Sequence, residues 1–395
     1  MLTLDRIYQA AHVLKDQIRK TDIIPCCDNL FIKTENLQFT GSFKVRGAYF
    51  KIASLSAEEK AKGIIACSAG NHAQGVALSA HRMGIKATIF IPNIAPISKI
   101  ESTKSLGADV RLVDGIYDDA YEAACEYQKT SGGIFIHPFD DIDVIAGQGT
   151  IGLELLEQVP NLDAVVIPVG GGGLISGVAF AVKKLNPAVK VYGVQAMGAG
   201  SMIQSLEKKE RMNLNHISTF ADSIAVKSPG KSTFEMCRQY VDRIVTVSDD
   251  ETATAILTLM EQQKLVAEGA GAVAVAAVLF DKLPLKGKKV CAVVSGGNID
   301  VNILSRVINR GLLTTGRMSE LKIEMLDKPG QLKEVSAIIA DMGANVIKVF
   351  HNPCGENTDI IGCYLHIAME TKNKEHFLSV KKAICRKGYV IVDEH

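Results

Sequence analysis

Short β-rich runs alternate with helix-like stretches in two regions of the chain, residues 63–145 and 163–312. This alternation predicts parallel sheets covered by helices on both faces, because each connection between parallel strands crosses over through a helix. The sequence therefore predicts an α/β fold with two parallel sheets. The predicted strands are Gly63–Cys67, Ala87–Ile91, Asp109–Val113, Ile134–His137, Ala164–Val169, Val189–Val194, Arg243–Val247 and Val290–Val294.

Residues 319–395 follow a different pattern, strand–helix–strand–strand–helix–strand. This βαββαβ order predicts a ferredoxin-like unit with a core of its own. We expect a linker at Leu313–Ser319, and so a first domain over residues 1–315 and a second over 319–395. The predicted elements are Leu321–Met325, a helix to about Met342, Val346–Phe350, Ile360–Ala368, Lys374–Arg386 and Tyr389–Val392.

Composition excludes several classes of partner. The 395 residues carry a net charge of +1 with no basic block, so nucleic acid and anionic membranes are poor partners. The longest apolar stretch, Ala270–Phe280, is too short to span a bilayer, and the first residues do not read as a secretory signal. The nine cysteines include no C-x-x-C pair, which predicts buried thiols in a cytoplasmic protein and no metal site.

Four consecutive glycines, Gly170, Gly171, Gly172 and Gly173, separate the predicted strand Ala164–Val169 from a helix-like run that begins at Leu174. A turn without side chains at a helix N-terminus lets several backbone N–H groups converge on one anion, and the helix dipole adds attraction. A flexible connection is the alternative, but a connecting loop rarely needs four glycines in a row. The run therefore predicts a phosphate site.

The neighbouring residues narrow down the phosphate. No lysine closes the run, as a Walker loop requires, and the dinucleotide fingerprint G-x-G-x-x-G fails because its last position falls on Ile175 or Ser176. The next strand ends at Gln195, where a dinucleotide site prefers an acidic residue for the ribose. The phosphate of a small cofactor is favoured over ATP or NAD, and an NAD-dependent oxidoreductase is a distant alternative.

A lysine with apolar neighbours gives the second chemical clue. Lys44 enters a predicted helix within Gly41–Ala48, and desolvation there would lower its pKa and allow a Schiff base. Alone, such a lysine reads as an ordinary solvated side chain. Beside a phosphate cradle it points to pyridoxal phosphate, the cofactor that needs both a lysine imine and a phosphate clamp.

Four motifs in order resemble the serine/threonine dehydratases, which belong to the tryptophan-synthase-β-like class of pyridoxal-phosphate enzymes. These motifs are Gly41–Ala48, Cys67–Gly75, Val169–Leu174 and Ser295–Asn298. The resemblance covers residues 1 to about 315 and implies two α/β subdomains, the smaller one (about 45–147) inserted in the larger. Residues 319–395 resemble an ACT regulatory domain, so the whole chain resembles the ACT-containing threonine ammonia-lyases.

The resemblance also implies roles for individual residues. Lys44 would bind the cofactor covalently and remove the α-proton of the substrate, and Asn71 would hydrogen-bond the cofactor's phenolic oxygen. The alternative for Asn71 and His72 is that they are ordinary helix-start residues. The implied cofactor-binding residues are Phe43, Lys44, Asn71, Gly170, Gly171, Gly172, Gly173, Leu174 and Ser295. The implied substrate-binding residues, whose N–H groups would take the α-carboxylate, are Ser68, Ala69, Gly70, Asn71 and His72.

Four positions bear on the type of reaction. Ser295 would face the pyridine nitrogen, and a hydroxyl there leaves this nitrogen neutral, which favours β-elimination over transamination. Related racemases carry a serine at the position of Ala69 as the base on the opposite cofactor face, and Ala69 cannot move a proton. Those members also bind a divalent ion through a Glu and an Asp that match Gln195 and Ser201 here, so no such ion is expected.

The implied activity is loss of the β-hydroxyl of L-threonine and hydrolysis of the resulting enamine to 2-oxobutanoate and ammonia, with L-serine as a slower substrate. Serine dehydratase, threonine synthase and a catalytically silent amino-acid sensor are the alternatives. An ACT unit places its amino-acid effector in the loop after the first strand, and isoleucine or valine is the first effector to expect. The alternative is a domain that serves oligomerisation alone and binds no effector. Such units pair across subunits, which implies a homotetramer or homodimer. The implied effector residues are Asp327, Pro329, Gly330, Gln331 and Leu332.

Overall fold

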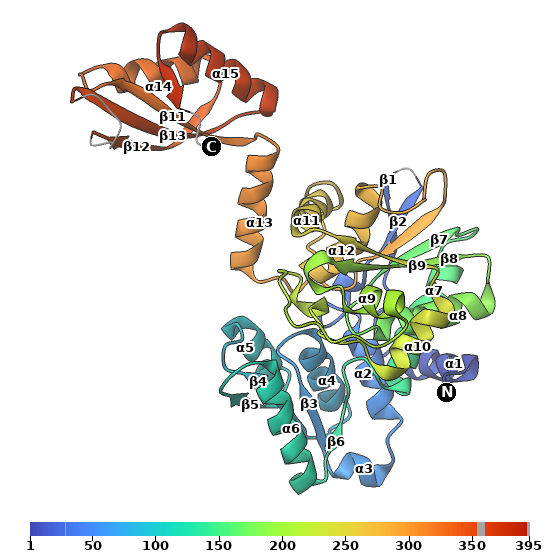
Figure 1. Ribbon diagram of the computed structural model, residues 1–395. Coiled ribbons are helices and arrows are strands. Elements are labelled where there is room, and N and C mark those ends of the chain that lie inside the picture. Colours follow the sequence, from blue (N-terminus) through green and yellow to red (C-terminus); the bar gives the residue numbers. More distant parts are fainter. Residues whose placement is uncertain (28, 354–359, 393–395) are drawn as a thin grey trace. The chain divides into compact units, whose positions relative to one another are not determined.

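The computed structural model describes residues 1–27, 29–353 and 360–392. The chain separates into two compact units, Met1–Ile303 and Leu304–His395, and helix α13 (Val301–Thr314) spans this division (Figure 1). The division lies before the linker predicted at 313–319 and falls within α13, which continues into the first two residues of that segment. The functional boundaries at 315 and 319 stay predictions.

A six-stranded sheet in the order β1-β2-β10-β7-β8-β9 forms the centre of the first unit. Its four predicted strands are present and pair in parallel. Strands β1 and β2, which pair antiparallel, were not predicted, because Pro25 interrupts an already short apolar run. The strands are β1 (Ile23–Cys27), β2 (Leu30–Lys33), β7 (Ala164–Pro168), β8 (Lys190–Ala196), β9 (Arg243–Val247) and β10 (Val290–Val293).

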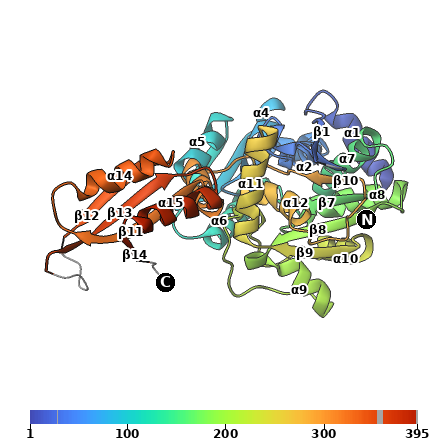
Figure 2. The same cartoon turned by 90° about the horizontal axis from the view of Figure 1, so that it is seen from above.

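Helices cover this sheet and pack closely. The alanine- and valine-rich helix α12 packs on β7, β8 and β9 (Figure 2). Helices α7 and α8 approach through glycine, since a Cβ on Gly177 would lie 2.2 Å from the Ile145 carbonyl oxygen. The helices are α1 (Leu4–Leu14), α2 (Lys44–Ala53), α7 (Ile142–Gln158), α8 (Gly173–Leu185), α9 (Ser201–Lys208), α10 (Lys231–Tyr240), α11 (Asp249–Gln263) and α12 (Gly269–Leu279), with 3-10 turns at Glu35–Leu37, Met197–Ala199 and Asp222–Ile224.

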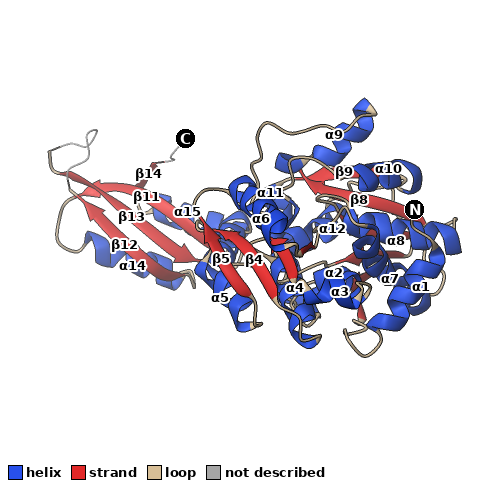
Figure 3. Cartoon of the chain, turned by 90° about the horizontal axis from the view of Figure 1, so that it is seen from below, coloured by secondary structure: helices blue, strands red, loops and turns tan. Residues whose placement is uncertain are grey.

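The first unit contains a second sheet, which has four parallel strands in the order β5-β4-β3-β6. In the sequence these strands lie between β2 and β7. All four of its strands were predicted, and α6 packs on β3, β4 and β5 (Figure 3). These two sheets, parallel except for the edge strand β1, confirm the predicted fold class, while the bounds of the inserted subdomain stay a prediction. The elements are α3 (Ala57–Ala61), β3 (Ile64–Cys67), α4 (Asn71–Arg82), β4 (Ala87–Pro92), α5 (Ile97–Ser105), β5 (Asp109–Val113), α6 (Tyr117–Ser131) and β6 (Ile134–Phe135).

The second unit has the predicted βαββαβ order, with an antiparallel sheet arranged β12-β13-β11-β14. Both helices cover one face of this sheet (Figure 1), and alternate residues such as Leu321, Ile323 and Met325 form its core. The elements are β11 (Met318–Leu326), α14 (Gln331–Asp341), β12 (Asn345–Asn352), β13 (Gly362–Glu370), α15 (Lys374–Arg386) and β14 (Val390–Val392). Within the described part of either unit, no helix combines the length and apolar character needed to cross a membrane.

Candidate active site

Two motifs from opposite ends of the first unit form one wall of the candidate site. Ser42 and Gly296 form an isolated antiparallel bridge, and the Phe43 amide donates to the Ser295 carbonyl at 3.1 Å. Gly41 has a φ of +67°, and a Cβ on it would collide with the Asn298 side chain at 2.4 Å. The backbone before α2 is thereby fixed to the loop after β10, which places Lys44 near Ser295.

Lys44 begins α2 and is partly buried. Its Nζ donates a hydrogen bond to the Pro138 carbonyl at 2.8 Å. Burial lowers the pKa of this amine to about 8, and the charge of Glu268 opposes the shift only in part. A larger share of neutral amine is therefore available near neutral pH than for an exposed lysine, as both Schiff-base chemistry and proton abstraction require.

One cavity of the first unit collects every residue predicted to bind the cofactor, from Phe43 and Lys44 to Ser295. The cavity unites segments that follow β3, β7 and β10, in keeping with ligand binding at the carboxyl ends of parallel strands. The individual roles of these residues stay predictions. Further lining residues, which sequence reasoning did not single out for this site, are Pro138, Phe139, Gln148, Pro168, Ser223, Ile224, Val226, Glu268 and Ala270.

The glycine loop can hold no side chains. A Cβ on Gly171 would lie 2.5 Å from the ring of Phe139, and one on Gly173 would lie 2.9 Å from the Phe139 Cα. Gly172 has a φ of +96°, and the Thr233 hydroxyl fixes the loop by donating to the Gly171 carbonyl at 2.6 Å. Helix α8 begins at Gly173, so its first N–H groups lack intrahelical partners and can bind an anion. Together with the buried amine of Lys44, this loop fits pyridoxal phosphate.

The loop after β3 leads into α4, which begins at Asn71. No atom lies within 4 Å of the position where a Cβ of Gly70 would stand, so the backbone there borders open space. His72 differs, because its ring is buried and Nε2 donates to the Ile136 carbonyl at 2.8 Å. Burial and the nearby Lys44 lower its pKa to about 3, so the ring stays neutral. Of the predicted substrate-binding residues, Ser68, Ala69 and Gly70 are partly exposed and Asn71 and His72 are buried.

A buried hydrogen-bond chain supports Asn71. Its Nδ2 donates to Glu268 Oε1 at 2.6 Å, and its Oδ1 accepts from Asn298 Nδ2 at 2.7 Å. Burial, with a smaller contribution from Asp222, raises the pKa of Glu268 to about 7. Glu268 was assigned no role from the sequence. The structure shows that it holds the side chain expected to meet the cofactor's phenolic oxygen.

The raised pKa of Glu268 predicts a pH-dependent stability. The folded protein keeps the Glu268 proton up to about pH 7, whereas the unfolded chain loses it near 4.5. Folding stability contributed by this group therefore falls as pH rises between these values. We expect the isosteric Glu268→Gln variant to gain melting temperature relative to the parent enzyme as pH rises from 5 to 8. Parallel melting curves of the two proteins across this range would contradict the assignment.

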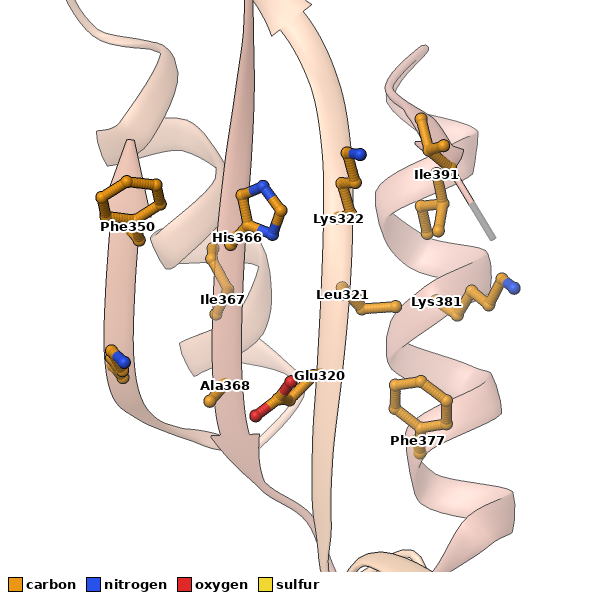
Figure 4. Close-up of a pocket in the computed structure, with 12 residues that line it drawn as sticks. Glu320, Leu321, Lys322, Phe350, His366, Ile367, Ala368, Phe377, Lys381 and Ile391 are labelled. Atoms are coloured by element: carbon orange, nitrogen blue, oxygen red, sulfur yellow. The ribbon is translucent and has the colours of Figure 1, made fainter. Parts of the chain in front are cut away.

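The predicted effector residues Asp327, Pro329, Gly330, Gln331 and Leu332 lie in and after the loop between β11 and α14. Gly330 has a φ of +97°, which accounts for glycine at this position. A cavity of about 480 Å³ in the same unit is lined by other residues, among them Lys322, Phe350 and His366 on the strands and Phe377 and Lys381 on α15 (Figure 4). The predicted effector residues therefore do not line this cavity.

Comparison with known proteins places this geometry in a family. A family model described as pyridoxal-phosphate dependent enzyme matches residues 15–296. The chain is 50% identical to the L-threonine ammonia-lyase of Thermotoga maritima over 398 residues, which cover 99% of each chain. The processed threonine deaminase isoform 2 of Solanum lycopersicum has a similar structure, with a TM-score of 0.74 and 38% identity over 78% of this chain and 94% of that one. Maize serine racemase gives a TM-score of 0.74 with 34% identity over 79% of this chain and 98% of that one.

These matches confirm the family resemblance predicted from the four sequence motifs, and with it the cofactor, pyridoxal phosphate. The likeness to the Thermotoga relative extends through the second unit, whereas the likeness to the two solved structures covers less than four-fifths of the chain. The chain therefore belongs to the family of pyridoxal-phosphate-dependent enzymes that contains the threonine ammonia-lyases.

Proposed function

We propose that this enzyme converts L-threonine to 2-oxobutanoate and ammonia, with L-serine converted to pyruvate as a slower reaction. The observation that carries the proposal is the position of Lys44, whose low-pKa amine shares one cavity with the glycine loop and Ser295. The full-length similarity to a relative named L-threonine ammonia-lyase supports threonine as the substrate.

Different residues around the cavity have different roles in this elimination. Backbone N–H groups at the start of α4 bind the substrate carboxylate, which orients the α-carbon. The Lys44 amine removes the α-proton, and the β-hydroxyl departs as water after taking up a proton. Water then hydrolyses the released enamine to 2-oxobutanoate and ammonia. The bound cofactor supplies an electron sink for the charge that develops at the α-carbon. Ser295, a neutral partner, limits this delocalisation and so favours loss of the β-substituent.

A second candidate reaction, racemisation, is suggested by the similarity to a serine racemase. Racemisation needs a base on each face of the substrate. Ala69 offers only a methyl group where the second base would stand. Gln195 matches the glutamate with which the related racemases bind a divalent ion, and here both polar atoms of its side chain form hydrogen bonds within the connection from β8 to α9. Its Nε2 donates to the Ala199 carbonyl at 3.2 Å and its Oε1 accepts from the Ile203 amide at 2.9 Å. Elimination without racemisation is therefore the favoured outcome.

A steady-state assay tests this assignment directly. We expect 2-oxo acid formation with a higher kcat/KM for L-threonine than for L-serine, and no effect of chelators of divalent ions on that rate. Chiral analysis of residual L-serine after many turnovers should detect no D-serine. Formation of D-serine at a rate comparable to pyruvate would overturn the one-base mechanism, and a preference for serine would overturn the substrate assignment.

We further propose that an amino acid, isoleucine or valine first, binds the loop Asp327–Leu332 and changes the affinity for threonine. The support is the open backbone at Gly330 and the N-terminus of α14, whose N–H groups suit a carboxylate. We expect a coupling of about 1–3 kcal/mol, a typical allosteric value. Threonine saturation curves with and without effector measure it, in the parent chain and in a Gly330→Val variant. An unchanged response in the variant would place the effector elsewhere.

A further inference from the structure

Three different metal-binding side chains meet at one end of the sheet of the second unit. Asp327 directly follows β11, His351 lies near the end of β12, and Cys363 lies at the start of β13. In the strand register His351 stands opposite Leu365, which is two residues after Cys363, so His351 and Cys363 point to the same face of the sheet. The positions are far apart in sequence, which is why no spacing motif indicated them.

The ligand atoms are close enough for a single ion. One oxygen of Asp327, one ring nitrogen of His351 and the sulfur of Cys363 all lie within 4.8 Å of one another. His351 Nε2 and Asp327 Oδ1 are 3.4 Å apart. Ligand atoms at zinc bond lengths of about 2.0–2.3 Å in tetrahedral geometry are roughly 3.3–3.8 Å apart. Adjustments of about 1 Å, which the exposed side chains of Asp327 and His351 permit, would complete this geometry.

We propose that Asp327, His351 and Cys363 form a binding site for a divalent transition-metal ion of the zinc type. A thiolate and an imidazole favour zinc or a neighbouring transition metal over magnesium and calcium, which prefer oxygen ligands alone. Three protein ligands leave one coordination position for water or another small ligand. The bound ion would link the loop after β11 to β12 and β13 at one point.

This site differs from a simple surface ion pair in the role of Cys363. An ion pair between His351 and Asp327 at 3.4 Å needs no thiol, and Cys363 is fully buried in the core of the second unit. Its sulfur nevertheless lies within 4.8 Å of an oxygen of Asp327 and a ring nitrogen of His351. The proposal therefore requires that ion binding depend on the sulfur as well as on the imidazole.

Cobalt titration of the full-length chain tests the proposal. The protein, first treated with a chelator, is titrated with Co²⁺, and cofactor absorption is removed by difference spectra. We expect one equivalent to bind, with the near-ultraviolet absorption typical of cobalt–thiolate bonds, and Zn²⁺ to displace it. The titration uses a background in which Cys26 and Cys27 are serine, because these adjacent thiols are at least partly exposed.

Variants then assign the ligands. Cys363→Ser should abolish the thiolate absorption and weaken binding at least about tenfold, and His351→Ala should weaken binding similarly. His351 is exposed, so this second variant tests the site even if the buried Cys363→Ser substitution impairs folding. Matched controls are Cys385→Ser on α15 and His366→Ala on β13, which should bind as the parent does. Absence of thiolate absorption in the parent, or equal affinity in the His351 variant, would overturn the proposal.

Discussion

Replacement of Lys44 by alanine should reduce turnover by roughly 10³-fold or more, which is within the range that a positioned general base contributes. The expectation rests on the buried amine, whose pKa of about 8 suits both covalent attachment and proton transfer. The variant should keep its fold, since the substitution removes one hydrogen bond to the Pro138 carbonyl, worth about 1 kcal/mol.

Cofactor attachment provides a readout that does not depend on activity. Borohydride treatment should fix the cofactor covalently to the parent enzyme and to Lys62→Ala, a control at an exposed lysine in the same unit. The Lys44→Ala protein should retain no fixed cofactor and lack the visible absorption band of the parent. A borohydride-stable adduct in the Lys44→Ala protein would show that another lysine carries the cofactor.

The sequence could predict the elements whose signals are local. The parallel strands appear as short apolar runs, and the four glycines and Lys44 sit in recognisable contexts at strand ends or helix starts. The resemblance extended these signals to Asn71 and Ser295, which line the same cavity in the structure. Such residues are predictable because the chemistry of phosphate and imine binding restricts their types.

The residues that were missed depend on contacts between distant segments. Phe139 packs over Gly171, and Gln148 lines the same cavity as Lys44, yet neither belongs to a pattern visible in its own segment. Glu268 was given no role, because its hydrogen bond to Asn71 joins positions 197 residues apart. The same reason applies to Asp327 and Cys363, which only the pairing of β11 with β13 brings together.

A second large effect, on the free energy of unfolding, is expected at Arg46, two residues after Lys44. The guanidinium of Arg46 is fully buried and contacts two carboxylates. Arg46 donates to both carboxylate oxygens of Glu35, at 2.7 and 2.8 Å. It also donates to both oxygens of Glu154, at 2.6 and 2.9 Å, and Lys33 Nζ completes the group 2.6 Å from Glu154. Two positive and two negative side chains are thereby balanced, and the carboxylates raise the pKa of Arg46 despite its burial.

Arg46→Met should therefore lower the free energy of unfolding by about 3–5 kcal/mol, because Glu35 is left as a buried charge without its partner. Lys33 and Glu154 can still pair, so the double variant Arg46→Met/Glu35→Gln removes the uncompensated charge and should recover part of the loss. The matched control is Lys20→Met, which breaks an exposed pair with Glu157 on the same helix as Glu154 and should cost less than about 1 kcal/mol.

Denaturant unfolding followed by circular dichroism compares the four proteins. If the buried charge is the cause, the order of stability is parent, Lys20→Met, double variant and Arg46→Met. Equal losses for Arg46→Met and Lys20→Met would contradict the argument, as would a double variant less stable than Arg46→Met. Because Arg46 and Lys44 share the first turn of α2, the same charge group holds the start of this helix, and with it the reactive amine, against the strand β2 and helix α7.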